Sequence, residues 1–162
     1  MKATRLLFLL ILLGCSSAHA MAQSSSSVVK VRPAESSYKL KQGAAAQVGL
    51  VVEIQDGYHI NSNRPSDKNL IATALKFDRV AGLSTTPVMY PRAKTQKFEF
   101  SPKPLLVFEG KITFKFSARA LPAAATGNHV LKGKLTVQAC NNQFCLPPKT
   151  VDVAIPVEVI SK

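Results

Sequence analysis

Two cysteines, Cys140 and Cys145, carry the reactive chemistry of this sequence. They flank the four residues 141–144, while the third cysteine, Cys15, lies in a segment typical of export signals. In an oxidising compartment two cysteines so close in sequence usually form a disulfide. A four-residue hairpin loop would place them opposite each other with Cα atoms about 4.5–5.5 Å apart, a spacing that a disulfide accepts. We therefore expect a Cys140–Cys145 bond.

The short span of this bond favours redox chemistry over stabilisation. A six-residue loop contributes only about 2 kcal/mol in the chain-entropy model, against about 4.7 kcal/mol for a hundred-residue loop. Thiol–disulfide exchange needs an accessible sulfur and a second thiol that resolves the mixed disulfide. Pro147 and Pro148 remove two backbone donors just after Cys145, so we expect an exposed edge there. Local hairpin disulfides also occur as structural features, and this alternative stays open.

Other kinds of active site find little support in the sequence. In the mature chain only His59 and His129 accompany the cysteines as candidate metal ligands, and their spacing does not fit a zinc site, which usually takes four ligands. We expect no metal and no cofactor, and we interpret both histidines as solvated or capping groups. Hydrolase and nucleotide motifs such as G-x-S-x-G, the P-loop and H-E-x-x-H do not occur.

Residues 1–20 have the layout of a secretory signal peptide. Two basic residues precede the apolar run 6–13, and small residues end at Ala20, where we expect cleavage. The run is too short to span a bilayer, which needs roughly 20 apolar residues. A second interpretation is a bacterial lipoprotein signal, in which Cys15 carries a lipid anchor. Either route exports the domain to the periplasm or cell envelope.

The chain is strongly basic, with a formal net charge of +12. Such a charge attracts nucleic acid, anionic lipid or acidic proteins. Export argues against nucleic acid, and the basic residues are scattered, without an aromatic-studded basic motif. We therefore expect no nucleic-acid partner, and we interpret the charge as a solvated surface that aids solubility or contact with an anionic membrane face.

The mature sequence predicts β-structure throughout. Its apolar runs have strand length and are separated by Gly, Pro, Asn and Asp. The clearest runs are residues 28–31, 47–54, 71–77, 105–108, 112–116, 130–137 and 151–159. About seven to nine short strands predict an all-β, immunoglobulin-like β-sandwich. The cysteines are too close in sequence to form the inter-sheet bridge of antibody domains.

The length of 162 residues allows one ordinary domain and a processing segment. We divide the chain into a signal peptide at 1–20, a flexible linker at 21–27 and one immunoglobulin-like thiol–disulfide interchange domain at 28–162.

The segment around the cysteine pair, residues 137–149 (VQACNNQFCLPPK), resembles the signature of the amino-terminal periplasmic domain of the bacterial electron transporter DsbD. Residues 57–71 (GYHINSNRPSDKNLI) are similar to that family's early strand and loop, and segments within 90–101 and 107–110 are similar to its middle part. The similarity spans about residues 28–160. Its most specific element is Q-A-C-x4-C-L-P-P.

This resemblance implies a domain of the protein-disulfide reductase type, which receives electrons from a thioredoxin-like domain and passes them to thioredoxin-like periplasmic proteins. It implies that Cys145 forms the intermolecular bond and that Cys140 resolves it. The resemblance also implies a cap loop that shields the pair with an aromatic residue, and Phe98 or Phe100 would take this role here. The alternative is ordinary core packing of both rings on one face of a strand. Tyr58 lines the active pocket by the same analogy, although half-buried aromatics at strand ends are common.

The full transporter continues into a membrane section and a thioredoxin-like domain, whereas this sequence ends at Lys162. We therefore expect a separate membrane electron carrier as the source of electrons. An alternative from another class is a redox-inert, disulfide-stapled binding or assembly module of the cell envelope. Both hypotheses predict the same fold and the same disulfide, and they differ in the reactivity that they predict for Cys140 and Cys145.

Overall fold

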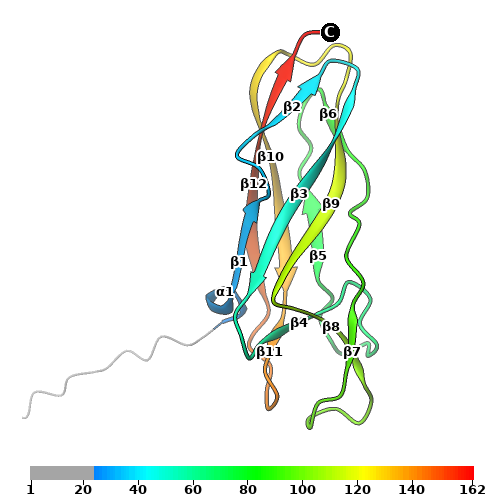
Figure 1. Cartoon of the computed structure of the whole chain (residues 1–162), viewed down its shortest axis with the longest axis vertical. Helices are drawn as coiled ribbons and strands as arrows, with labels where there is room; N and C mark the ends of the chain where they lie inside the picture. Colours follow the sequence, from blue (N-terminus) through cyan, green and yellow to red (C-terminus); the bar gives the residue numbers. More distant parts are fainter. Residues whose placement is uncertain (1–23) are drawn as a thin grey trace, which may run out of the picture.

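The computed structural model describes residues 24–162 (Figure 1). The predicted signal peptide and the candidate lipid anchor Cys15 lie outside the described residues. The elements in chain order are α1 (Ser25–Val28), β1 (Val29–Pro33), β2 (Tyr38–Lys41), β3 (Ala45–Ile54), β4 (His59–Asn61), β5 (Ala74–Phe77), β6 (Leu83–Thr85), β7 (Lys94–Gln96), β8 (Leu105–Glu109), β9 (Lys111–Ala120), β10 (Gly127–Val137), β11 (Ala139–Cys140) and β12 (Lys149–Ile160). No helix in this part of the chain is long and apolar enough to cross a membrane.

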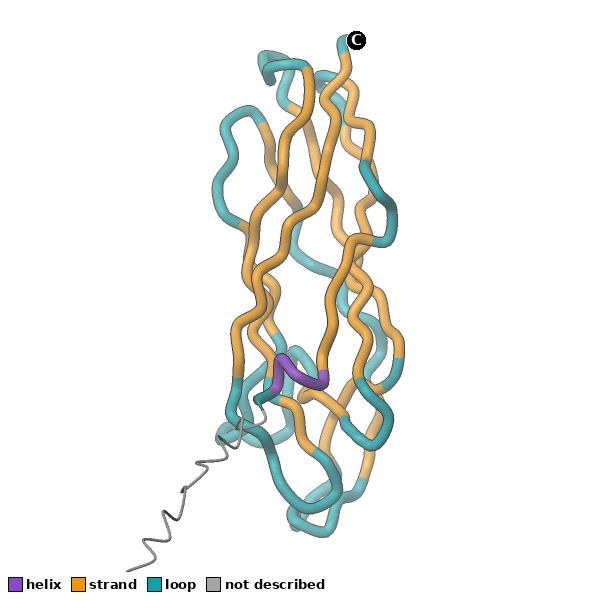
Figure 2. Tube along the Cα trace, turned by 90° about the vertical axis from the view of Figure 1, so that its left-hand side faces the viewer, coloured by secondary structure: helices purple, strands orange, loops and turns teal. Residues whose placement is uncertain are grey.

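The strands form three four-stranded sheets, with the orders β1-β3-β9-β6, β2-β12-β10-β5 and β11-β4-β8-β7. The first two sheets run along the molecule and enclose the core, while the third closes the end opposite the C-terminus (Figure 1). Figure 2 shows α1 at that same end. The protein is thus an immunoglobulin-like β-sandwich, as the sequence predicts.

The core follows from the alternation of apolar and polar residues along the long strands. β10 and β12 pair antiparallel over their whole lengths, and Leu131 lies opposite Ile155 with both side chains buried. Their polar neighbours face solvent, because successive side chains of a strand point to opposite faces. Phe116 on β9 of the first sheet and Phe77 on β5 of the second pack with ring centroids 4.5 Å apart, so aromatic contact joins the two sheets.

The predicted apolar runs are confirmed as strands, whereas several short strands of the structure were not predicted. Six runs are strands over all or most of their length, and in the seventh, 71–77, the strand β5 begins only at Ala74. The predicted strand before Cys140 is interrupted at Gln138, where the chain leaves β10 in the second sheet and enters β11 in the third. The cysteine pair therefore belongs to the small end sheet.

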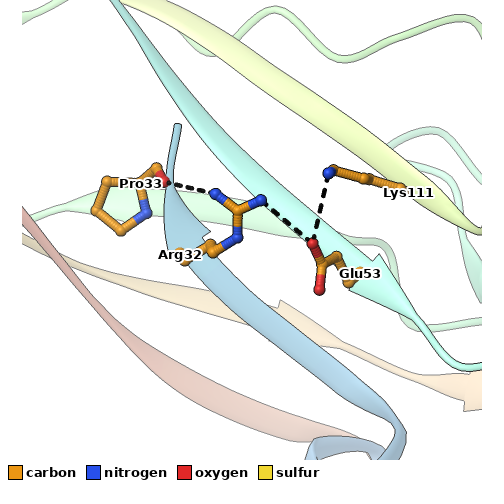
Figure 3. A network of polar contacts seen from close by, with 4 residues as sticks. All are labelled: Arg32, Pro33, Glu53 and Lys111. Carbon is orange, nitrogen blue, oxygen red and sulfur yellow. Dashed lines mark hydrogen bonds and ion pairs between the residues drawn. The ribbon is translucent and has the colours of Figure 1, made fainter. Parts of the chain in front are cut away.

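The outer face carries ion pairs that join neighbouring strands. Glu53 on β3 contacts Arg32 on β1 at 3.4 Å and Lys111 on β9 at 3.8 Å, and Arg32 also donates a hydrogen bond to the Pro33 carbonyl (Figure 3). All three charged side chains are well exposed to solvent. Since exposed pairs contribute only about 0–1 kcal/mol each, the buried core holds the fold together.

The amino-terminal end of the described chain is tied to the cysteine hairpin, which corrects the predicted linker. Ser25 is fully buried. Its hydroxyl donates to the Pro147 carbonyl at 2.7 Å and accepts from the Ala139 amide at 2.9 Å. Part of the segment 21–27, predicted to be a flexible linker from its serine content, is thus held in place, because a serine hydroxyl can donate and accept at once.

Candidate functional site

The candidate site is the hairpin that carries Cys140 and Cys145, and the predicted disulfide between them is present. The two residues form an antiparallel bridge with Cα atoms 3.9 Å apart, closer than the spacing expected for a generic cross-strand pair. Backbone hydrogen bonds close the hairpin on both sides of this bridge. The Asn141 amide donates to the Phe144 carbonyl at 2.9 Å, and the Leu146 amide donates to the Ala139 carbonyl at 2.8 Å.

The loop between the cysteines is shaped by one asparagine side chain. Asn141 Oδ1 accepts hydrogen bonds from the backbone amides of Gln143 at 2.8 Å and Phe144 at 2.9 Å. Asparagine commonly forms such turns, because its short side chain reaches the backbone two residues ahead. The turn leaves the Phe144 ring 50% exposed, directly beside Cys145.

The two cysteines are buried to different degrees. Cys140 lies on β11, pairs with β4 and is 0% exposed, whereas Cys145 follows the exposed loop and is partly accessible. Pro147 and Pro148 are exposed, in agreement with the edge expected after Cys145. A protein that approaches this hairpin therefore meets Cys145 first.

His59 is the unexpected member of the site. It lies opposite Cys140 in the β4–β11 pairing and opposite Glu109 in the β4–β8 pairing, so the three side chains stand on one face of the end sheet. His59 is 2% exposed, and its Nε2 atom has no hydrogen-bond partner within residues 24–162. Burial lowers the pKa of His59 to about 4 against the opposing effect of the Glu109 carboxylate, so the ring is neutral at pH 7.

The prediction that both histidines are solvated or capping groups is therefore wrong for His59. Its position between two neighbouring strands of the end sheet removes it from water, which the local sequence does not reveal. His129 is different: its Nε2 lies 2.8 Å from the Ala125 carbonyl oxygen at the other end of the sandwich. That contact fits a capping role.

An aromatic stack covers His59. The ring centroids of Phe98 and His59 are 4.0 Å apart, with an interplanar angle of 20°. The ring centroids of Phe100 and Phe98 are 5.4 Å apart, with an angle of 16°. Phe98 is 4% exposed and packs with Leu105 and Val107, whereas Phe100 is 37% exposed. The stack thus runs from the neighbour of Cys140 to the surface.

Both phenylalanines belong to a loop, which contradicts their alternative interpretation as alternating residues of one strand. β7 ends at Gln96, and the loop that follows, residues 97–104, is named the cap loop here. Lys97 secures it with hydrogen bonds from Nζ to the carbonyls of Ser101 at 2.8 Å and Pro102 at 2.7 Å. The cap loop reaches the cysteine hairpin: Glu99 and residues 141–143 line the same shallow groove.

A pocket opens beside His59. Its lining includes Tyr58, His59, Glu109 and Asn142 of the cysteine loop. Lys94 also lines it and forms an ion pair with Glu109 at 3.3 Å. Tyr58 thus shares a pocket with Asn142 of the cysteine loop, and its role in lining the active pocket stays a prediction. Among residues 24–162 no cluster of three or more His, Cys, Asp and Glu side chains is arranged to hold a metal ion.

A nearly all-β, immunoglobulin-like domain that presents a disulfide in a short loop at one end has the arrangement of a thiol–disulfide exchange domain. The sequence narrows this class to one family. Residues 25–156 match the family described as "Thiol:disulfide interchange protein DsbD, N-terminal", and the chain belongs to this family. The match begins at Ser25, which the hydrogen bonds described above also place inside the fold.

Solved structures are similar to this chain at low sequence identity. The N-terminal periplasmic domain of ScsB from Proteus mirabilis is 13% identical with a TM-score of 0.50, and the match covers 80% of this chain and 45% of that chain. This chain thus spans less than half of that structure. The ASH/PapD-like domain of human CEP192 is 15% identical with a TM-score of 0.39, covering 100% of this chain and 98% of that chain. No curated protein matches the sequence.

Proposed function

We propose that this domain passes electrons between thioredoxin-like proteins of the periplasm by reversible opening of the Cys140–Cys145 disulfide. The observation that carries the proposal is the unequal burial of the two bonded cysteines, 0% exposure for Cys140 and partial exposure for Cys145. Exchange between proteins needs one sulfur that a partner can reach and a second thiol close by that resolves the mixed disulfide, and unequal burial assigns these two roles to Cys145 and Cys140. Membership of the thiol:disulfide interchange family supports the same assignment.

In the reduced domain the Cys145 thiolate attacks one sulfur of a partner's disulfide. A mixed disulfide forms, and the other partner sulfur leaves as a thiolate. The Cys140 thiolate then attacks Cys145 Sγ, which restores the Cys140–Cys145 bond and releases the second partner sulfur. Two electrons have passed to the partner, and a thioredoxin-like reductant returns the domain to its dithiol form by the reverse sequence.

The cap loop has a role in this cycle. Phe98 lies over His59, the direct neighbour of Cys140, and Glu99 faces the cysteine loop across the shallow groove. The loop thus covers one side of the hairpin and limits access while no partner is bound. Of the two candidates for the capping ring, the buried Phe98 fits this role better than the exposed Phe100.

The reduction potential of the Cys140–Cys145 bond, measured against glutathione and against a thioredoxin, tests this function. An exchange domain has a potential in the range of cellular thioredoxin-like proteins, whereas a value below about −300 mV marks a structural disulfide. Such a value would support the alternative, a redox-inert stapled module.

Trapping experiments test the roles of the two cysteines. Cys140→Ser leaves Cys145 able to attack but removes the resolving thiol. With a thioredoxin that keeps one active-site cysteine, activated as a disulfide with thionitrobenzoate, Cys145 displaces thionitrobenzoate and this variant accumulates a mixed disulfide that neither protein can resolve. Cys145→Ser, the matched control, keeps only the buried cysteine and traps little. Equal trapping by both variants, or trapping by neither, refutes the assignment.

A further inference from the structure

One buried polar side chain at the site has no part in the cycle described so far. His59 lies directly opposite Cys140 in the strand pairing, and its Nε2 atom is enclosed without a hydrogen-bond partner in the described chain. We propose that His59 is the proton acceptor for the Cys140 thiol in the step that resolves the mixed disulfide. This inference rests on the proposed function, since it assigns a residue to one step of that cycle.

The strand register supplies the geometry. Directly opposed residues of an antiparallel pair point to the same face, with Cβ atoms about 4.5–5.5 Å apart, so the His59 and Cys140 side chains start from adjacent positions on one face of the sheet. The stack with Phe98 at 4.0 Å holds the ring in one plane. A buried polar atom normally has a hydrogen-bond partner, and in the reduced protein the Cys140 S–H group supplies the donor that Nε2 lacks.

The burial of Cys140 creates the need for an acceptor. Only the thiolate attacks a disulfide, and an apolar, water-free environment disfavours the thiolate. Since Cys140 is 0% exposed, bulk water does not reach its thiol to remove the proton. Cys145, which is partly exposed, has no such difficulty.

Burial disfavours the charged form of His59, and the neighbouring Glu109 offsets part of this cost while the imidazolium exists transiently. Glu109 lies opposite it on β8, and its carboxylate raises the affinity of the imidazole for a proton. The other ionisable groups around the ring are Lys94 on β7, paired with Glu109, and Asp56 and Tyr58 in the turn before β4, all of which line the same pocket. This pocket gives the proton a route from the buried ring to solvent.

Resolution of the mixed disulfide moves one proton and exchanges one sulfur–sulfur bond for another. With Cys145 joined to a partner sulfur, the Cys140 proton moves to His59 Nε2, and the Cys140 sulfur attacks Cys145 Sγ. The Cys140–Cys145 bond forms with two electrons from the thiolate, and the bond to the partner breaks with its pair leaving on the partner sulfur. The imidazolium then releases its proton through the pocket. His59 ends the cycle neutral.

Dithiobis(nitrobenzoate), an aromatic disulfide with a coloured thiolate product, separates the two steps in a stopped-flow experiment. Attack by Cys145 releases the first coloured thiolate, and resolution by Cys140 releases the second. We expect the second rate in the wild-type protein to change little between pH 8 and pH 6, because a neutral His59 accepts the proton throughout. A wild-type rate that falls tenfold per pH unit refutes the proposal without any variant.

The variants sharpen this test. His59→Phe keeps the stack with Phe98 and removes the acceptor, and His59→Gln keeps a polar side chain that cannot take the proton. For both we expect a second release that is about 100-fold slower at pH 7 and falls about tenfold per pH unit below it, with an unchanged first release. His129→Gln, at the other end of the sandwich, is the matched control and behaves like wild type.

A second release with wild-type rate and pH profile in both His59 variants overturns the role of His59. The proposed function fails in a different way, through a reduction potential below about −300 mV or the absence of trapped partner. The two failures are distinguishable, because the aromatic disulfide reports on resolution whether or not a protein partner exists.

Discussion

Lowering the pH from 7 to 4.5 destabilises the oxidised protein through His59. In the unfolded chain this histidine titrates near 6.5, whereas burial lowers its pKa in the folded protein to about 4. The unfolded state therefore binds more protons between these two pH values, and the free energy of unfolding decreases as the pH falls. The contribution is complete above pH 6.5 and lost below pH 4. The full shift corresponds to ~3 kcal/mol, of which about 2–3 kcal/mol is lost by pH 4.5.

Urea unfolding of the oxidised protein at pH 7 and pH 4.5 measures this effect. His59→Phe removes the titrating group and keeps an aromatic ring against Phe98, so its free energy of unfolding decreases less across this interval, by about 2–3 kcal/mol. The comparison with His59→Phe removes pH effects that both proteins share. His129→Gln, the control, retains the wild-type dependence. Equal pH dependence in wild type and His59→Phe refutes the conclusion that His59 is buried and neutral.

Three further predictions concern the hairpin, the sandwich and the cap loop. Ser25→Ala leaves the buried Ala139 amide without an acceptor and lowers the free energy of unfolding by about 1–3 kcal/mol in urea titrations, whereas the exposed Ser26→Ala changes it little. Gly133→Ala places a Cβ atom 2.6 Å from a backbone oxygen of β5, and we expect a loss of about 1–3 kcal/mol in the same assay. Phe98→Ala removes a ring whose burial contributes about 1.5–3 kcal/mol to closure of the cap loop, so reduction of the disulfide by dithiothreitol should accelerate at least about tenfold, while Phe100→Ala has a small effect.

The long strands could be predicted because each is specified by its own residues. The alternation in β10 and β12 and the continuous apolar run in β3 are visible without knowledge of the partner strands. β4, β7 and β11 contain only two or three residues each, and β4 and β11 are strands because of partners far away in sequence. The end sheet that holds the site consists of these short strands and β8, so only β8 was predicted and the sheet as a whole was missed.

The same distinction separates the predicted site residues from the missed ones. The pair Cys140 and Cys145 could be found from residue type, spacing and family resemblance, since its geometry is local. His59 becomes relevant only through the β4–β11 register, and Ser25 only through hydrogen bonds to both sides of the hairpin. A lone histidine beside a turn and a serine within a polar run give no sequence signal of these contacts.

The hairpin explains how the disulfide can open without loss of the site. The Asn141–Phe144 and Ala139–Leu146 backbone hydrogen bonds close the loop independently of the sulfur–sulfur bond, and Ser25 links the two sides of the hairpin a third time. None of these contacts involves a sulfur atom, so we expect them to persist in the dithiol form. Reduction therefore leaves the Cys140 and Cys145 thiols close together, as resolution of a mixed disulfide requires. If the backbone changes little on reduction, the bond contributes little as a staple, and its position at the accessible hairpin fits the proposed reversible chemistry.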